Sequence, residues 1–450
     1  MFNKLSQQKI VSIFMIFFFI AGPFSITQWN KINILIIFIL SSTTLLLTAL
    51  LGRKLRFWLI SFYPSLIYIF SFIVSLFALI LTREYLTGEY FDSVIFGRLF
   101  TFITVSFVLF IINLWLSQVG NDELLRSLKI TFSIGFCFVL LGHWQFIGNL
   151  FGIPFFIETR DWMHGVPAAI RSVLPMRLTS IAEEPNFLSP LLIEYLILTG
   201  LVVNGVLIRF GAYALGLFVL VLSFSGGVYV NLILILAFYS ILSLYRSFTL
   251  SKIKIRDFIF LFFIVLCFGL VISIGNILID FISVKLQGEA GGQSGRSQFL
   301  LSLTQLISNS DFSQLLLGHG MATMSVLTAF GLPKDEFLFR ITNNFYLDMI
   351  WEGGFLGLFL ILMFFIYLLF IGIKSYLINK YYEAGLLFTV HMMITCLYRS
   401  EYLSSHFLWV MTLIFICYKK GAIDMQRELT SSMPKINNHS ATLRGEDGIS

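Results

Sequence analysis

The sequence predicts an all-α polytopic membrane protein with about twelve transmembrane helices. Hydrophobic residues make up 58% of the 450 residues and charged residues only 12%, which is too few charges for the surface of a water-soluble domain. The apolar residues form long runs, and a helix of about 20 such residues crosses the hydrocarbon core of a bilayer. The runs are continuous and do not alternate, which argues against the strands of an outer-membrane barrel.

The apolar runs give the expected spans in chain order. They lie at 10–27, 32–51, 57–81, 94–115, 130–151, 187–208, 210–224, 228–244, 258–279, 353–373, 384–399 and 405–418. No small-residue cleavage site follows the first run, so we interpret it as a span and not as a signal peptide. The short runs at 210–224 and 228–244, and the last two runs, also fit re-entrant hairpins.

Lysine and arginine mark alternate short loops between these runs. Examples are Arg53 and Lys54, Arg126 and Lys129, and Arg209. Because basic residues accumulate in short cytoplasmic loops, we expect both termini to be cytoplasmic. The net charge of +6 mostly reflects this topology, and no basic stripe on a soluble domain indicates nucleic-acid binding.

The membrane domain then covers residues 1–418, and two long polar segments, 152–186 and 280–352, fall outside the cell membrane. The polar segment 419–450 is expected to be a disordered cytoplasmic tail. All four cysteines lie in apolar runs, which argues against a disulfide framework and a thiolate metal site. The cytoplasmic loops hold no Gly-rich phosphate-binding motif, which argues against an ATP- or nucleotide-sugar-driven enzyme on the inner face. We expect no cofactor.

Ionisable residues inside the predicted spans are rare. Arg98 and Glu194 are the clearest cases, and an intramembrane charge is costly enough to mark function or pairing. Arg98 sits near the end of its span, where its side chain reaches the interface. For Glu194, pairing inside the helix bundle is favoured over catalysis.

The first outer loop ends in the pattern Arg-x₅-Glu-Glu-Pro-Asn-Phe, from Arg177 to Phe187. Pro185 suits the first turn of the next helix, which places Glu184 at a helix N-terminus, where a carboxylate is favoured. The plain alternative is that Glu184 only caps this helix. Arg160 and Arg171 lie upstream in the same loop, and arginine is suited to bidentate phosphate binding.

Three further motifs follow. They are Ser223-Phe224-Ser225-Gly226-Gly227 in the next hairpin, Gly295-Arg296 in the large loop, and Gly318-His319-Gly320 followed by Asn343-Asn344-Phe345-Tyr346-Leu347. The glycines indicate tight turns. Arg340 lies just before the last motif, which precedes a Gly-rich span start.

In this order, the motifs between residues 170 and 360 resemble the O-antigen polymerase and ligase superfamily of bacterial polysaccharide assembly. The resemblance implies a helical membrane fold in which the large outer loop caps an outward-facing cavity. It implies an undecaprenyl-diphosphate-linked oligosaccharide as donor and metal-independent, inverting glycosyl transfer at the outer face of the cytoplasmic (inner) membrane. Membrane lipids, a chain-length regulator and a flippase are the partners that it suggests.

Residue roles follow from this chemistry. A departing diphosphate needs fixed cations when no metal is present, and we assign Arg177 and Arg296 to it, with Arg160, Arg171 and Arg340 as helpers. The acceptor hydroxyl needs a base within hydrogen-bond reach; Glu184 is the first candidate and His319 the second. Tyr346 is a candidate for stacking on a sugar, although packing at the bilayer interface is the plainer role.

One departure favours a polymerase over a ligase. Ligase members carry His in the pattern His-Asn-x-x-Leu, where this sequence has Asn343. Asparagine is not a base at neutral pH, so Asn343 and Asn344 are expected to bond substrate or to cap a helix. The alternatives are a ligase on the same fold and, in a different class, a lipid-linked oligosaccharide flippase or other transporter. A flippase would be expected to carry charges inside its spans.

Overall fold

The computed structural model describes residues 7–51, 56–82, 95–153, 177–250, 303–323, 343–377, 379–401 and 403–432, and these residues contain helices and no strand. Nine helical segments of this part of the chain are long and apolar enough to cross a membrane. An all-helical polytopic membrane protein, as the sequence predicts, is therefore confirmed at this coarser level. The predicted span at 258–279 and most of the loop 280–352 lie outside the described residues.

The described residues form twelve α-helices and one 3₁₀-helix. In chain order they are α1 (Gln7–Ala21), η2 (Gly22–Ile26), α2 (Asn30–Leu50), α3 (Leu59–Thr82), α5 (Phe96–Gln118), α6 (Asn121–Phe151), α8 (Pro185–Val202), α9 (Val206–Leu222), α10 (Gly226–Leu250), α14 (Phe312–Leu317), α15 (Phe345–Ser375), α16 (Lys380–Tyr398) and α17 (Ser405–Ser432). Helix α9 is apolar but shorter than the nine candidate spans, and η2 and α14 have only five and six residues.

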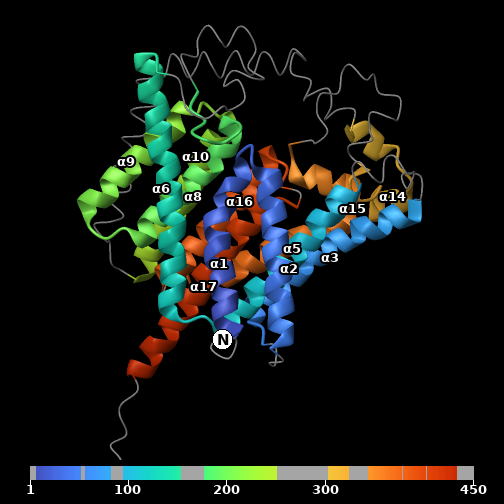
Figure 1. Ribbon diagram of the computed structural model, residues 1–450, viewed down its shortest axis with the longest axis horizontal. Helices are drawn as coiled ribbons and strands as arrows, with labels where there is room; N and C mark the ends of the chain where they lie inside the picture. The colour runs from blue at the N-terminus through green and yellow to red at the C-terminus, as the bar shows by residue number, and fades with distance from the viewer. Residues whose placement is uncertain are drawn as a thin grey trace, which may run out of the picture.

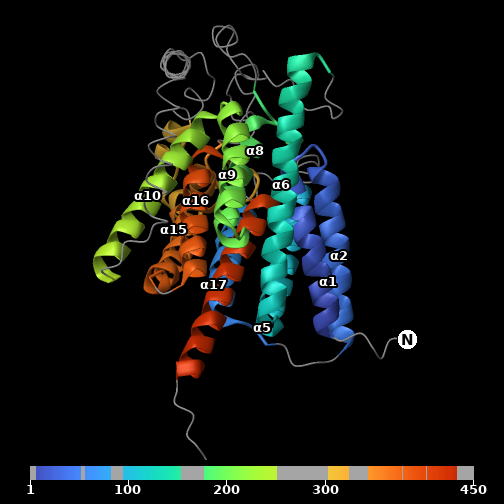
Figure 2. The same ribbon diagram turned by 90° about the vertical axis from the view of Figure 1, so that its left-hand side faces the viewer.

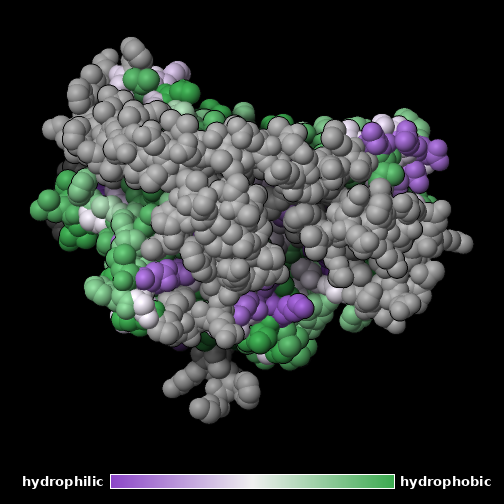
Figure 3. All heavy atoms as spheres, turned by 90° about the horizontal axis from the view of Figure 1, so that it is seen from above, coloured by the Kyte–Doolittle hydropathy of each residue, from purple (hydrophilic) through white to green (hydrophobic). Residues whose placement is uncertain are grey.

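Helix α16 occupies the centre of the bundle. It packs against α8, α10, α15 and α17. In Figure 1, α8, α9 and α10 lie on one side of it and α3 and α14 on the other. The view from the side in Figure 2 shows that the axes of the long helices are roughly aligned with one another. Large apolar side chains remain exposed on the outer helices, among them Leu46, Trp144 and Phe359. From above, hydrophobic residues surround much of the rim (Figure 3), as lipid contact requires.

A loop segment replaces hydrogen bonds that α15 loses at a kink. Gly354 has φ 62°, which breaks the regular helix. The backbone N–H of His319 donates to the carbonyl of Trp351 (2.7 Å), and that of Gly320 donates to the carbonyl of Glu352 (3.1 Å). The Gly-His-Gly motif thus satisfies backbone groups that membrane helices cannot leave unpaired.

Three boundaries differ from the sequence-based expectations. Helix α15 begins at Phe345, inside the predicted loop 280–352, because Asn344 caps it there. Helix α6 begins at Asn121, before the predicted start at 130. The prediction of a disordered tail from residue 419 is wrong for residues 419–432, which continue α17. Lys420 is buried there and pairs with Asp424 at 2.5 Å, one helical turn away.

Candidate functional site

Two of the motifs meet at the turn between α9 and α10. Arg177 Nε donates to the carbonyl oxygen of Ser223 at 3.3 Å, and the hydroxyls of Ser189 and Ser223 lie 2.9 Å apart. The Ser225 hydroxyl donates to Asn186 Oδ1 at 2.7 Å. The segment from Arg177 into α8 and the Ser-Phe-Ser-Gly-Gly turn therefore form one structure, which we call the arginine junction.

The start of α8 has the geometry that the sequence predicts. Pro185 is the first helical residue, and Glu184, with extended backbone angles, precedes it as the cap residue. The Glu184 side chain does not cap the helix through a hydrogen bond of its own. Burial lowers the pKa of the Arg177 guanidinium, and the negative charge of Glu184 opposes that change. Arginine is still charged under these conditions, so Arg177 and Glu184 form an electrostatic pair.

A second polar group lies deeper, among α8, α10 and α16. Glu194 is nine residues into α8, about 14 Å along the helix from Pro185. Its Oε1 lies 3.2 Å from Nε2 of His391, and the other ring nitrogen of His391 lies 3.3 Å from Asn231 Oδ1. Pairing of Glu194 inside the bundle, which the sequence favours, is therefore confirmed.

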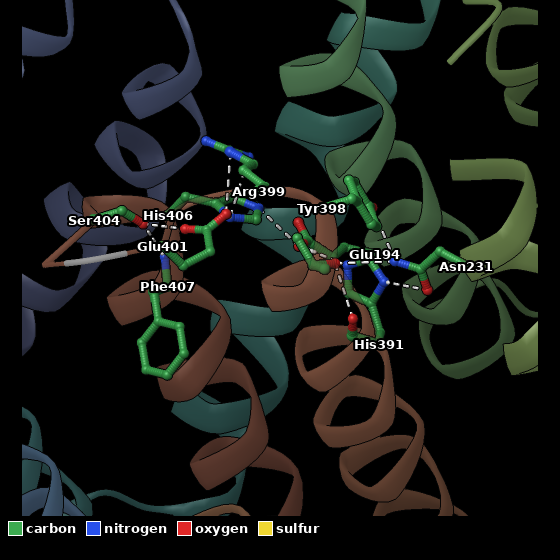
Figure 4. Close-up of polar contacts among 10 residues, drawn as sticks. Glu194, Asn231, His391, Tyr398, Arg399, Glu401, Ser404, His406 and Phe407 are labelled. Atoms are coloured by element: carbon green, nitrogen blue, oxygen red, sulfur yellow. Dashed lines mark hydrogen bonds and ion pairs between the residues drawn. The ribbon is translucent and has the colours of Figure 1, made fainter. Parts of the chain in front are cut away.

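The same oxygen, Glu194 Oε1, extends this series of polar contacts to α17. His406 Nε2 lies 2.9 Å from Glu194 Oε1, and its Nδ1 lies 3.1 Å from Glu401 Oε1. Glu401 pairs in turn with Arg399 Nε at 3.1 Å and accepts a hydrogen bond from the Ser404 hydroxyl. Figure 4 shows this line of side chains crossing from α10 through α8 and α16 to the α16–α17 connection. We call Glu194, His391, Arg399, Glu401 and His406 the charged cluster.

The α16–α17 connection joins the charged cluster to other predicted site elements. The Arg399 guanidinium lies over the ring of Phe187, 4.7 Å from its centroid, and Phe187 is one turn of α8 from Glu184. The hydroxyl of the next residue, Ser400, donates to Asp348 in the first turn of α15. The first turns of α8 and α15 therefore approach the same connection from two sides.

The remaining predicted residues in the described part lie near α15. Asn344 Oδ1 accepts from the backbone N–H of Tyr346 (3.0 Å) and of Leu347 (3.2 Å), so it caps α15. Asn343 has φ 54°, which suits the turn before that helix. The Tyr346 hydroxyl donates to the carbonyl of Met393 at 3.0 Å. Tyr346 thus links α15 to α16.

His319 lies in a packed position. Its ring stacks on Trp351 with centroids 3.9 Å apart, and its Nε2 lies 2.9 Å from the Ser310 hydroxyl. Burial lowers the pKa of His319 to about 4. The described contacts place Arg177 and Glu184 together at the arginine junction, whereas those of His319 are with Ser310 and Trp351. Arg160, Arg171, Arg296 and Arg340 lie outside the described residues.

Sequence reasoning missed four members of the charged cluster. His391, Arg399, Glu401 and His406 fall in or between the last two apolar runs. Their signal was rarity, because the chain has only six histidines and charges in apolar runs are uncommon. His391 and His406 could have been found by the reasoning used for Glu194, that an ionisable group inside a span marks function or pairing.

Four of the five side chains in the charged cluster, two imidazoles and two carboxylates, can exchange protons, and Arg399 is a fixed cation. Within the described residues, no group of three or more His, Cys, Asp or Glu side chains is placed to hold a metal ion. Glu194 lies between the two imidazoles and His406 lies between the two carboxylates, an arrangement that suits proton storage and anion binding. No protein-family model matches the sequence, and a search of curated proteins found no similar sequence.

Proposed function

We propose that this protein is a metal-independent glycosyltransferase that polymerises undecaprenyl-diphosphate-linked oligosaccharide repeat units. It acts in this proposal at the outer face of a bacterial cytoplasmic membrane, with both termini inside, and its product is O-antigen, capsule or exopolysaccharide. The supporting observation is the arginine junction, where Arg177 of one family-like motif bonds Ser223 of another. Two motifs that are weak alone thereby become parts of one local structure.

The junction supplies the two kinds of group that the reaction needs. The C–O bond between the donor sugar and the diphosphate breaks as the acceptor hydroxyl forms a new bond to the same carbon. Arg177 is buried and fixed through Nε to Ser223, so its charge needs little reorganisation to stabilise the leaving diphosphate. Glu184, paired electrostatically with Arg177, receives the hydroxyl proton in this mechanism. Arg296 is proposed to share the diphosphate with Arg177.

The test is deletion of the gene followed by electrophoresis of the surface glycan. Loss of a polymerase leaves a single repeat unit on its lipid carrier or core, and the wild-type gene restores long chains. Loss of a ligase instead leaves no attached glycan, and loss of a flippase traps units inside the cell. Either of these last two patterns would contradict the proposal.

Purified protein with lipid-linked repeat units in detergent gives a second test. Elongation is expected to continue in EDTA, because in this mechanism Arg177 and Arg296 stabilise the leaving diphosphate. If EDTA stopped elongation and a divalent ion restored it, the metal-free mechanism would be wrong.

The charged cluster favours one other candidate, a lipid-linked oligosaccharide flippase. Charges inside the spans are what a transporter of a charged lipid would carry, and Glu194, His391 and His406 are such groups. The detergent assay separates the two functions because it has no second compartment. Elongation there requires a polymerase, whereas a flippase would leave the repeat units unchanged.

A further inference from the structure

The hydrogen bonds around His391 determine how many protons the His391 ring and the Glu194 carboxylate hold together. The Thr395 hydroxyl donates to the carbonyl of His391 (2.8 Å), so Thr395 Oγ1 must accept from Asn231, and Asn231 Nδ2 lies 3.0 Å from it. That fixes the Asn231 amide with Oδ1 toward His391 Nδ1, which must donate. The other nitrogen faces Glu194 Oε1. A hydrogen bond there needs a second proton, carried by either partner, so the Glu194–His391 pair is neutral overall.

His406 is in a similar position. Both of its ring nitrogens lie close to carboxylate oxygens. Nδ1 is hydrogen-bonded to Glu401 Oε1 at 3.1 Å, and Nε2 lies 2.9 Å from Glu194 Oε1, a close contact without hydrogen-bond geometry. A neutral imidazole has only one N–H, so it would leave one close N···O contact between two lone pairs. The favoured state is an imidazolium, which balances the charge of Glu401.

Counted by themselves, without the nearby carboxylate of Asp348, the five side chains of the charged cluster carry one positive charge more than they balance. Two protonated pairs, Glu194 with His391 and Glu401 with His406, are neutral, and the guanidinium of Arg399 remains. Burying a net charge is costly, and all five side chains are buried. The arrangement is balanced if one anion joins it.

Arg399 is where an anion can enter. It is 9% exposed, whereas Glu194, His391 and Glu401 are 0% exposed and His406 is 1% exposed. Its present partner Glu401 also bonds His406 and Ser404. Arg399 can therefore exchange Glu401 for an incoming anion without leaving a buried carboxylate unpaired, which would be strongly destabilising.

We propose that the charged cluster is a proton-linked anion site, in which one phosphate or diphosphate group binds at Arg399 while the Glu194–His391 pair keeps its proton. Assigning that group to the lipid-linked donor or to the released carrier rests on the proposed function. Loss of this proton removes the positive excess, which weakens anion binding. Anion release and proton release are then linked, and by reciprocity a bound anion strengthens proton binding.

The charged and titratable groups around His391 come from each helix that packs against α16. Helix α8 contributes Glu194, and α17 contributes His406. Helix α10 contributes the uncharged amide of Asn231 near His391, and its Arg246 pairs with Glu383 further along α16.

Helix α15 contributes the Tyr346 hydroxyl, which bonds Met393, and the Asp348 carboxylate, which bonds Ser400. Asp348 is the competing negative charge in this region. If it neutralised Arg399, the cluster would carry no excess charge and would bind no anion.

The experiment is calorimetric titration of the purified full-length protein in detergent with two probes, inorganic diphosphate and a short isoprenyl diphosphate. Titrations in buffers of different ionisation enthalpy count the protons taken up. We expect up to one proton taken up per anion and an affinity that falls by up to tenfold per pH unit as the pair deprotonates. Binding of both probes would indicate a phosphate site, and binding of the isoprenyl probe alone would indicate a lipid headgroup site.

Variants separate the two parts of the site. Arg399→Gln is expected to weaken binding about tenfold or more, with partial recovery in Arg399→Lys. His391→Gln removes the shared proton and with it the positive excess, so it is expected to bind the anion more weakly than wild type and without proton uptake. His143→Gln is the control, because His143 contacts the carbonyl of Leu215 outside the cluster (3.1 Å) and should match wild type.

Two outcomes would overturn the site. One is that folded Arg399→Gln binds both probes as tightly as wild type; the other is that wild type binds neither probe or takes up no proton. Elongation is measured separately, so failure of the proposed function is distinguishable. Proton-linked anion binding without elongation would support the anion site and contradict the polymerase. Elongation with the same pH profile in His391→Gln as in wild type would support the polymerase and contradict the proton-linked site.

Discussion

The two described arginines proposed to contact phosphate are held in different ways. Arg177 is anchored to a backbone carbonyl at a helix turn, and Arg399 is anchored to a carboxylate and lies over an aromatic ring. Arg177 is anchored by a carbonyl and has the charge of Glu184 nearby, whereas the carboxylate that anchors Arg399 is in direct contact with it and neutralises it until an anion replaces that carboxylate. Arg177 therefore suits permanent electrostatic stabilisation, and Arg399 suits reversible binding.

Substituting Arg177 tests the first of these roles. Arg177→Ala is expected to lower the elongation rate about 100-fold or more, and Arg177→Lys should also be impaired because lysine offers a point charge and no fork. The rate is measured with purified protein and lipid-linked repeat units. Arg209→Ala is the matched control, since Arg209 also donates to a helix-end carbonyl, that of Val203 (2.7 Å). Equal rates for Arg177→Ala and wild type would exclude the assignment.

At the scale of elements, the kink of α15 and the segment 318–320 depend on each other. Gly318 and Gly354 both have positive φ. A Cβ on Gly318 would lie 2.4 Å from the backbone carbon of Glu352, and a Cβ on Gly354 would lie 2.4 Å from that of Leu316. Only glycine permits this approach of two backbones, so the motif is explained by packing at this point.

Gly318→Ala is expected to destabilise the junction of α14 and α15. The strained backbone alone costs about 1–3 kcal/mol, and the clash with Glu352 adds to it, so thermal unfolding in detergent should occur at a lower temperature. Gly97→Ala is the control, because a Cβ there meets nothing within 4 Å. The packing account fails if both variants unfold at the wild-type temperature.

The same junction should respond to pH through His319. Its pKa in the folded protein is about 4, below the ordinary value of 6.5, because burial disfavours the charged ring. Between these values the undocked segment binds a proton that the docked segment does not, so docking is most stable above pH 6.5 and weakens as the pH falls toward 4. Hydrogen exchange of residues 345–352 should accelerate over that interval.

A His319→Gln variant is the control for this pH dependence. Glutamine retains a polar contact toward Ser310 but does not titrate in this range. Its exchange rates, corrected for intrinsic pH effects, should change little between pH 6.5 and 4. If hydrogen exchange in the wild-type protein were equally independent of pH, His319 would not titrate between pH 6.5 and 4, and this explanation would be wrong.

At the scale of the whole molecule, the charged cluster and the arginine junction lie at the same region of the bundle. Phe187 contacts Arg399 and belongs to the α8 turn that begins at Glu184. Helices α8, α16 and α17 thus bring together residues that are about 200 positions apart along the chain. This arrangement places both sites on the outer side if the termini are cytoplasmic.

Membrane orientation is testable by cysteine labelling. In a cysteine-free background, Ile153→Cys at the end of α6 should react with an impermeant maleimide in intact spheroplasts, because residues 152–186 are predicted to be outside. Ser431→Cys, in the last turn of α17, should react only after lysis. Both positions are exposed in the structure. The reverse pattern would invert the topology and place the arginine junction on the cytoplasmic side.

The sequence by itself determined the helical membrane class, most span positions and the start of α8 at Pro185. These follow from hydropathy and proline geometry, which act over one or two turns. It also predicted that Glu194 would find a partner, since an unpaired carboxylate in a bilayer is costly.

Only the tertiary structure decided which partners Glu194 has, because His391 and His406 approach it from helices distant in sequence. It also extended α17 past Lys420, which is buried over the ring of Tyr381 in α16 and pairs with the partly exposed Asp424. Local composition encodes how polar a segment is, but the pairing of buried charges depends on which helix faces meet. That choice is made by packing over the whole bundle.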